Sequence, residues 1–291
     1  MTTHRPRRSA LYMPGSNARA LDKAKAVAAD TVIMDLEDAV APEMKATARD
    51  QVAATVAAGG FGRKEVVIRI NGLDTPWGTD DLAAAAASKA DAVLIPKVSN
   101  PRMLADVARG MAGARPEQRI WAMIETPLGV LNVGEIAASA HEPAGRLACF
   151  VIGTNDLVKE TRAELDDNRT AALYWLSAIL TAGKAYGLDV LDGVYNDFKD
   201  APGLLRESRQ GRQLGMDGKT VIHPDQIATV NEVFQPSAQE VDAAVRIIAA
   251  FELPENKGRG AITLNGRMVE LLHVDMARRT VAIAKAIARD N

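Results

Sequence analysis

The chain has 291 residues, of which 47% are hydrophobic and 25% charged, a composition that suits a globular protein with a substantial core. The formal net charge is −2 and the pI is about 6.1, so no overall positive field exists to hold nucleic acid, and we expect no such partner. A single cysteine, Cys149, excludes an intrachain disulfide and favours a reducing compartment. Because no apolar run reaches membrane-spanning length and no signal-peptide pattern is present, we expect a cytoplasmic protein without a membrane partner.

Short apolar runs rich in Val, Ile and Leu recur along the chain. They lack strict polar alternation, which indicates strands buried on both faces, as in a parallel sheet. The expected strands are Ala10–Met13, Thr31–Met34, Val66–Ile70, Ala92–Ile95, Ile120–Ile124, Ala148–Ile152, Val190–Leu191 and Thr220–Ile222, of which the seventh has the weakest pattern.

Longer segments between these runs have helical spacing of apolar residues, and several carry a proline at their start, which is a helix-entry signal. They are Asn17–Ala29, Glu43–Ala58, Thr79–Ala90, Pro101–Ala112, Pro127–Ala140, Asn168–Tyr186, Pro202–Leu214 and Pro224–Phe234. Alternating strands and helices in this order predict a closed (β/α)8 TIM barrel, because each parallel strand needs a crossover helix. An open doubly wound sheet is the alternative, but the glycine-rich phosphate fingerprint typical of it does not follow the first strand.

The repeat ends near residue 235, so we expect a barrel over residues 1–235 and a C-terminal extension over residues 236–291. Within the extension the pattern predicts a helix over Gln239–Phe251, a flexible loop from Pro254 to Gly260 and a final helix over Met268–Ala288. We expect the extension to act as a lid or an oligomerisation arm. A packing helix that only covers the barrel is the alternative.

Polar residues stand at or just after the expected strands, where barrels carry their chemistry. Any one of them could be a capping or salt-bridging residue, but together they would converge on one mouth. The set is Tyr12, Asp35, Glu37, Asp38, Arg69, Asn71, Lys97, Glu125, Asn155, Asp156, Asp192, Asn196 and His223.

Glu125 and Asp156 follow consecutive strands, so their carboxylates can meet. Carboxylate oxygens suit a hard ion such as Mg²⁺, whereas no Cys/His cluster indicates zinc. An acid/base pair is the alternative, but the cations of the same mouth, Arg69 in particular, favour metal binding with an anionic substrate. Lys97 could form a Schiff base, although we favour a salt bridge to the acidic cluster at residues 35–38.

Seven motifs, in order over nearly the whole chain, resemble those of the citrate lyase β-subunit-like, or malyl-CoA/citramalyl-CoA lyase, family. They are Ser9–Gly15, Ile33–Val40, Ile68–Asn71, Ile95–Val98, Ile124–Thr126, Gly153–Leu157 and Gly218–Pro224. The resemblance implies a barrel that binds CoA thioesters and Mg²⁺, with Mn²⁺ as a substitute. It also implies a homo-oligomer, a trimer or hexamer, in which the lid reaches a neighbouring subunit.

The same resemblance assigns roles residue by residue. Glu125 and Asp156 would be the metal ligands, and Glu37 and Asp38 would orient metal-bound water. Arg69 would contact the reacting oxygen of the substrate. Contacts to CoA or the acyl group would come from Tyr12, Arg19, Lys23, Ile222 and His223.

Two segments of the extension, Gly258–Ala261 and Gly266–Glu270, resemble the family's lid motif. The family commonly has an aspartate where this chain has Glu270, and a proline soon after, where this chain has Leu271-Leu272-His273. Asn155 also departs from the acid that often precedes the metal-binding aspartate. These differences bear on the activity rather than on the family.

The main functional hypothesis is a Mg²⁺-dependent retro-aldol or Claisen-type lyase. It would cleave a malyl-, β-methylmalyl- or citramalyl-CoA-like ester to a 2-oxo acid and acetyl- or propionyl-CoA. Arg69 would stabilise the enolate, and Glu270 would act as the acid or base at its carbon. The alternatives are a metal-dependent thioesterase on the same esters, a citrate lyase β-like subunit acting on a carrier-protein thioester, and a barrel scaffold without catalysis.

Overall fold

The computed structural model describes residues 5–143 and 145–290. Within them, eight parallel strands pair in chain order, and β8 pairs with β1 to close the barrel. The strands are β1 (Ser9–Pro14), β2 (Thr31–Asp35), β3 (Glu65–Arg69), β4 (Ala92–Ile95), β5 (Arg119–Ile124), β6 (Leu147–Ile152), β7 (Asp189–Asp192) and β8 (Gly218–Val221). The predicted TIM barrel is therefore confirmed and the open sheet is excluded.

Side chains of alternate strand residues fill the barrel interior, as the two-residue period of a strand requires. The buried cluster comprises Ala10, Ile33, Val67, Ala92, Leu94, Trp121, Met123, Cys149, Val151 and Leu191. Burial raises the pKa of the Cys149 thiol, so this cysteine is a packing residue with little thiolate character.

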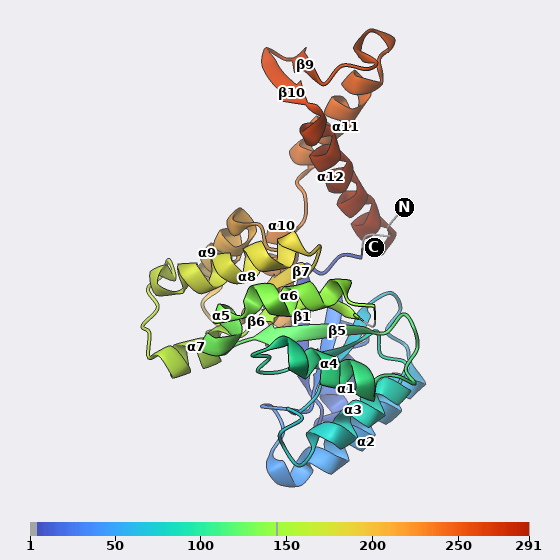
Figure 1. Ribbon diagram of the computed structural model, residues 1–291, viewed down its shortest axis with the longest axis vertical. Helices are drawn as coiled ribbons and strands as arrows, with labels where there is room; N and C mark the ends of the chain where they lie inside the picture. Colours follow the sequence, from blue (N-terminus) through green and yellow to red (C-terminus); the bar gives the residue numbers. More distant parts are fainter. Residues whose placement is uncertain (1–4, 144, 291) are drawn as a thin grey trace. The chain divides into compact units, whose positions relative to one another are not determined.

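The helices lie outside the strands (Figure 1). They are α1 (Ala18–Lys23), α2 (Lys45–Ala58), α3 (Gly78–Ala87), α4 (Pro101–Gly110), α5 (Pro127–Leu131), α6 (Val133–Ala138), α7 (Thr154–Thr161), α8 (Leu173–Ala185), α9 (Ala201–Leu214) and α10 (Ile227–Phe234). Short 3₁₀ turns add η1 (Pro42–Met44), η2 (Ser139–His141), η3 (Thr170–Ala172) and η4 (Pro224–Gln226). Asn100 and Thr126, each just before a proline, cap α4 and α5 with their side chains.

Several predicted helix bounds are wrong. The helix expected over Pro127–Ala140 is interrupted at Asn132, whose side-chain amide donates to the Ser99 carbonyl at 2.8 Å. The helix expected from Asn168 begins only at Leu173, because Arg169 has a left-handed backbone with φ of 52°. The first expected helix ends early, at Lys23, and α7 was not predicted.

Contacts divide the chain into a barrel unit, Arg7–Val233, and a second unit that holds the chain from Phe234 onward. The second unit contains α11 (Ala238–Glu252), η5 (Pro254–Asn256), the antiparallel strands β9 (Ala261–Leu264) and β10 (Arg267–Glu270), and α12 (Leu271–Asp290). Asn265 and Gly266, with φ of 51° and 74°, form the tight turn between the two strands. Met268–Glu270 is thus a strand, which corrects the helix expected there.

Figure 1 shows α11 and α12 side by side within this unit, as their contacts require. Ser237 and Glu240 form a capping box that starts α11. Among the helices of the described residues, none combines the length and apolar character needed to cross a membrane.

Candidate active site at the carboxyl ends of the strands

A cavity of about 310 Å³ opens at the carboxyl ends of the barrel strands. Its lining gathers residues from β1, β2, β3, β5 and β6 and from the segments that follow β2, β5, β6, β7 and β8. The lining residues are Tyr12, Asp35, Asp38, Ala39, Arg69, Met123, Glu125, Ile152, Gly153, Thr154, Asn155, Asp156, Val194, Asn196 and Ile222. Nine of the residues predicted from the sequence therefore meet in one place: Tyr12, Asp35, Asp38, Arg69, Glu125, Asn155, Asp156, Asn196 and Ile222.

Glu125 follows β5 and is completely buried. One carboxylate oxygen, Oε1, accepts a 2.8 Å hydrogen bond from the Lys97 backbone N–H, whereas Oε2 has no hydrogen-bond partner. Burial, and then the charge of Glu37, raises the pKa of Glu125 to about 8. A buried carboxylate with one free oxygen is stabilised by a positive partner, so this residue fits a cation ligand.

Asp156 lies in the first turn of α7, half-buried, and lines the same cavity. Its charge is one of the smaller effects that raise the pKa of Glu125. Across the described residues, no three His, Cys, Asp or Glu side chains come close enough together to hold a metal alone. Two carboxylates nevertheless fit Mg²⁺, which commonly keeps several waters or takes substrate oxygens as its remaining ligands.

Arg69, at the end of β3, is held in one orientation by the acids around it. Its Nε and Nη2 donate to the two oxygens of Asp35, each at 2.7 Å, and its Nη1 lies 2.8 Å from Glu37 Oε2. Burial alone disfavours the cation, but the charge and hydrogen bonds of Asp35 hold the pKa of Arg69 well above its usual value. The guanidinium also lies 4.9 Å from the centre of the Tyr12 ring. Arg69 is thus a fixed positive group for an anionic oxygen.

Glu37 and Asp38 differ in their surroundings. Glu37 is buried, and its Oε1 accepts a 2.5 Å hydrogen bond from Lys97 Nζ. Asp38 is exposed at the edge of the cavity, 3.5 Å from Arg69 Nη1. The salt bridge predicted for Lys97 is therefore confirmed.

Three predicted substrate contacts, and Glu270, which was predicted to be catalytic, are not among the residues that line this cavity. Arg19 and Lys23 are exposed on α1, one helical turn apart and on the same face. His223 caps η4 through its Nδ1 and stacks on Phe198, with 4.8 Å between the ring centres. Glu270 ends β10 in the second unit, where its backbone N–H donates to His273 Nδ1 at 3.0 Å.

The sequence did not indicate that Asn155 and Asn196 would pair across the segments that follow β6 and β7. Each amide donates to the other, at 3.1 and 2.8 Å. Met123 was also missed, although it stands two residues before Glu125 and therefore faces the same side of β5. Strand alternation was the signal that could have found it.

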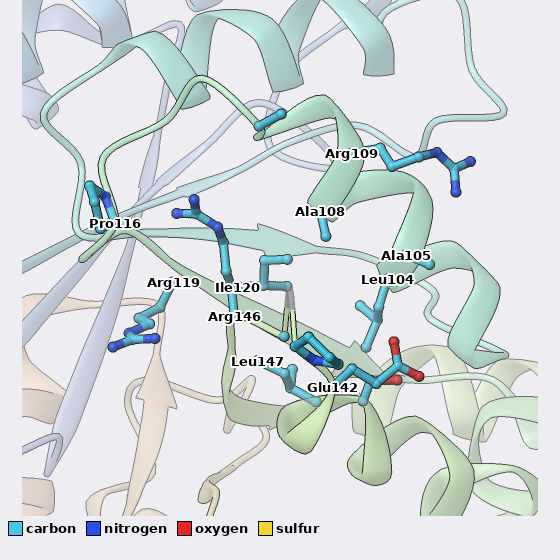
Figure 2. Close-up of a pocket in the computed structure, with 14 residues that line it drawn as sticks. Leu104, Ala105, Ala108, Arg109, Pro116, Arg119, Ile120, Glu142, Arg146 and Leu147 are labelled. Carbon is cyan, nitrogen blue, oxygen red and sulfur yellow. The ribbon is translucent and has the colours of Figure 1, made fainter.

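A second cavity, of about 560 Å³, lies between α4 and the first residues of β5 and β6. Figure 2 shows that the guanidinium groups of Arg109, Arg119 and Arg146 point in different directions there. Arg109 pairs with Asp106, and Arg146 donates to backbone carbonyls. Because these charges do not converge and the cavity is at the amino ends of the strands, we place the active site at the opposite end.

A closed parallel barrel with buried carboxylates and a fixed arginine at its carboxyl ends defines an α/β-barrel enzyme. Residues 8–224 match the HpcH/HpaI aldolase/citrate lyase family, and the chain belongs to this family. The resemblance read from the seven motifs is thereby confirmed.

Relatives extend over nearly the whole chain. The chain is 49% identical over 283 residues to a (3S)-malyl-CoA thioesterase of Cereibacter sphaeroides. The match covers 97% of this chain and 96% of that protein. It is 34% identical to citrate lyase subunit beta of Escherichia coli, over 97% of this chain and 94% of that protein.

Among solved structures, the chain is similar to CitE of Mycobacterium tuberculosis in complex with magnesium, acetoacetate and coenzyme A. The identity is 30% and the TM-score 0.74, and the match covers 94% of this chain and 97% of that one.

Proposed function

We propose that this chain is a Mg²⁺-dependent thioesterase that hydrolyses a (3S)-malyl-CoA-like ester to the free hydroxy acid and CoA. The observation that carries this proposal is the 49% identity, over 97% of the chain, to a protein with that activity. The sequence motifs alone favoured the carbon–carbon lyase, which remains the second candidate because the citrate lyase β subunit is also a relative, at 34% identity.

Glu125 and Asp156 would hold the Mg²⁺, and the free Oε2 of Glu125 supports this assignment. Magnesium is bound in the related CitE structure. When bound, the ion would polarise substrate oxygens and fix the carboxylate and hydroxyl of the acyl group.

The residues of the chain would perform the following steps. Arg69, held by Asp35, would stabilise the oxyanion formed when water adds to the thioester carbonyl carbon. Glu270 of the second unit would accept the proton of that water. Collapse of the oxyanion breaks the carbon–sulfur bond, and the departing CoA thiolate takes the proton from Glu270, which becomes a carboxylate again. Tyr12 and Ile222 line the cavity for the acyl group, while Arg19, Lys23 and His223 would contact CoA or the acyl group farther out.

We place the boundary between the barrel and the C-terminal extension near residue 236. The extension would serve as the lid of a neighbouring subunit in a homo-oligomer. Large apolar side chains at the end of its hairpin and the start of α12 support this role. Met268 is 70% exposed, Leu271 54%, Leu272 53% and Met276 62%. Exposed large apolar side chains gathered in one short stretch of chain are typical of an interface. Light scattering would test the proposed trimer or hexamer.

The decisive experiment incubates the purified protein with (3S)-malyl-CoA and Mg²⁺, with and without EDTA, and identifies the products by mass spectrometry. We expect malate and free CoA, and no products in EDTA. Glyoxylate with acetyl-CoA would replace our proposal with the lyase. Turnover only on an acyl carrier protein that co-purifies with the chain would indicate a β-like subunit instead.

A further inference from the structure

Lys97 has a backbone conformation that residues other than glycine rarely adopt. It follows β4 and has φ of 52°, in the left-handed region that favours glycine. Among the described residues other than glycine, only Arg162, Arg169 and Asn265 share a positive φ, and none of these lines the candidate active site. Unfavourable backbone conformations persist where the surrounding structure enforces them, often at functional sites.

In this conformation Lys97 donates hydrogen bonds to the carboxylates of two acidic residues. The backbone N–H of Lys97 donates to Glu125 Oε1 at 2.8 Å, and its ammonium donates to Glu37 Oε1 at 2.5 Å. Glu125 and Glu37 are both buried, and they lie after different strands, β5 and β2.

Hydrogen bonds connect the segment after β4 to residues on both sides of Glu125, in β5 and just after it. The Val98 N–H donates to the Met123 carbonyl at 3.1 Å, and the Ser99 and Thr126 hydroxyls lie 2.8 Å apart. Ser99 in turn bonds the Lys97 carbonyl at 3.0 Å. The left-handed turn at Lys97 is therefore held in place by its neighbours, and its N–H is aimed at one oxygen of Glu125.

We propose that Lys97 is a two-point positioning residue, whose backbone orients Glu125 for the metal and whose ammonium orients Glu37 beside Arg69. The catalytic consequence of this role rests on the proposed function, whereas the orientation of the two acids by Lys97 does not. With Oε1 occupied by the Lys97 N–H, Oε2 is the oxygen left to bind the cation. With Glu37 held by Lys97, Arg69 keeps its orientation toward the substrate.

The two contributions can be separated because one belongs to the backbone and the other to the side chain. Lys97→Gly keeps the N–H and adopts the left-handed conformation freely, but loses the ammonium. Lys97→Val also loses the ammonium and strongly disfavours the left-handed conformation. Lys97→Arg retains a cation at the same backbone position. Arg162→Val is the matched control, since Arg162 has φ of 59° but is exposed at the end of α7.

The experiment measures Mg²⁺ affinity by isothermal titration calorimetry, without substrate, and the kcat and KM of thioester hydrolysis. We expect Lys97→Gly to bind Mg²⁺ within about 3-fold of the wild type and Lys97→Val to bind it at least about 10-fold more weakly. Both should lose kcat by about 10-fold or more with a smaller change in KM, and Lys97→Arg should restore most of that kcat. Arg162→Val should keep wild-type Mg²⁺ affinity.

Equal Mg²⁺ affinity in Lys97→Gly and Lys97→Val would overturn the backbone role. Unchanged kcat in Lys97→Gly would overturn the ammonium role. If circular dichroism shows that Lys97→Val does not fold, Lys97→Ala replaces it. We expect the alanine variant, too, to bind Mg²⁺ more weakly than Lys97→Gly. A wild type that binds Mg²⁺ but hydrolyses no ester would contradict the proposed function alone, because the order of Mg²⁺ affinities still tests Lys97.

Discussion

Gly153 makes room for the carboxylate of Glu125. A Cβ atom at Gly153 would lie 2.5 Å from Glu125 Oε2 and 2.4 Å from Glu125 Cβ, which is closer than side chains pack. The glycine follows β6 and the glutamate follows β5, so the contact joins two neighbouring strands at the mouth of the barrel. The oxygen that Gly153 leaves unobstructed is the one that has no hydrogen-bond partner.

Gly153→Ala should therefore weaken Mg²⁺ binding by about 10-fold or more, because Glu125 must move to admit the methyl group. We also expect a loss of about 1–3 kcal/mol in unfolding free energy from overpacking. Calorimetry with Mg²⁺ and urea denaturation measure the two effects. Gly134→Ala is the control, since a Cβ there meets no atom within 4 Å and should leave Mg²⁺ affinity unchanged.

Glu125→Gln should abolish the stabilisation of the fold by Mg²⁺ while leaving the metal-free melting temperature equal or higher. The pKa of Glu125 is about 8, so at pH 7 the metal-free side chain is largely neutral, and an amide of the same shape resembles it. For the wild type, Mg²⁺ at about 100 times its Kd should add about 2.7 kcal/mol. A wild-type Mg²⁺ shift in the variant, measured by thermal denaturation, would contradict the ligand assignment.

Arg69→Lys should lower kcat of hydrolysis by roughly 10²–10³-fold, because lysine cannot reproduce the planar fork that Asp35 holds and that we propose stabilises the oxyanion. The charge is kept, so stability should fall less than in Arg69→Met, which leaves Asp35 and Glu37 buried without their shared cation. Steady-state kinetics and urea denaturation of both variants provide the comparison. Similar kcat in the lysine variant and the wild type would refute the role of the fork.

Asp192→Asn should show how a buried ion-pair cluster stabilises the barrel. Asp192 lies 2.8 Å from Arg169 Nη1 and 3.4 Å from Lys219 Nζ, and all three are buried. Burial alone would raise the pKa of Asp192, but the charges of Lys219 and Arg169 outweigh it and lower the pKa. The stabilisation is therefore present above the unfolded-state pKa of about 3.9 and is lost as the pH falls through the lower folded-state value.

At pH 7 we expect Asp192→Asn to cost about 3 kcal/mol, because Arg169 and Lys219 then keep only Glu207 as a carboxylate partner. The difference from the wild type should shrink in urea titrations below about pH 3.9. Asp22→Asn, at an exposed pair with Lys25, is the control and should change stability by less than about 1 kcal/mol at either pH. A difference that is constant with pH would contradict the ionised state of Asp192.

Glu270→Asp should raise the yield of 2-oxo acid relative to free hydroxy acid from malyl-CoA. It shortens this carboxylate by one methylene, to the aspartate that the motif resemblance leads us to expect here in a lyase. Glu270→Gln should reduce both products, since the amide cannot accept a proton. The ratio of glyoxylate to malate in the product mixture is the measurement. An identical ratio in Glu270→Asp and the wild type would show that this carboxylate does not set the reaction course.

Local sequence determined the order of strands and helices and which residues end the strands. Apolar runs such as Ile120–Ile124 must be buried on both faces, and the parallel sheet they require closes through crossover helices. Arg69 lies near the end of such a run, and Glu125 and Asp156 come shortly after theirs, so their shared mouth was predictable. The turn residues Asn265-Gly266 are typical of a hairpin, but we did not predict one because the apolar residues after Met268 have helical spacing.

Only the tertiary structure decided which acids share a cation and which oxygen stays free. The left-handed backbone of Lys97, the room left by Gly153 and the amide pair of Asn155 and Asn196 depend on neighbours that lie far away in the sequence. Such contacts have no periodic signature, because they are fixed by the distance between adjacent strands and not by the residues on either side. The sequence therefore determined the members of the site, and packing between strands determined their orientations.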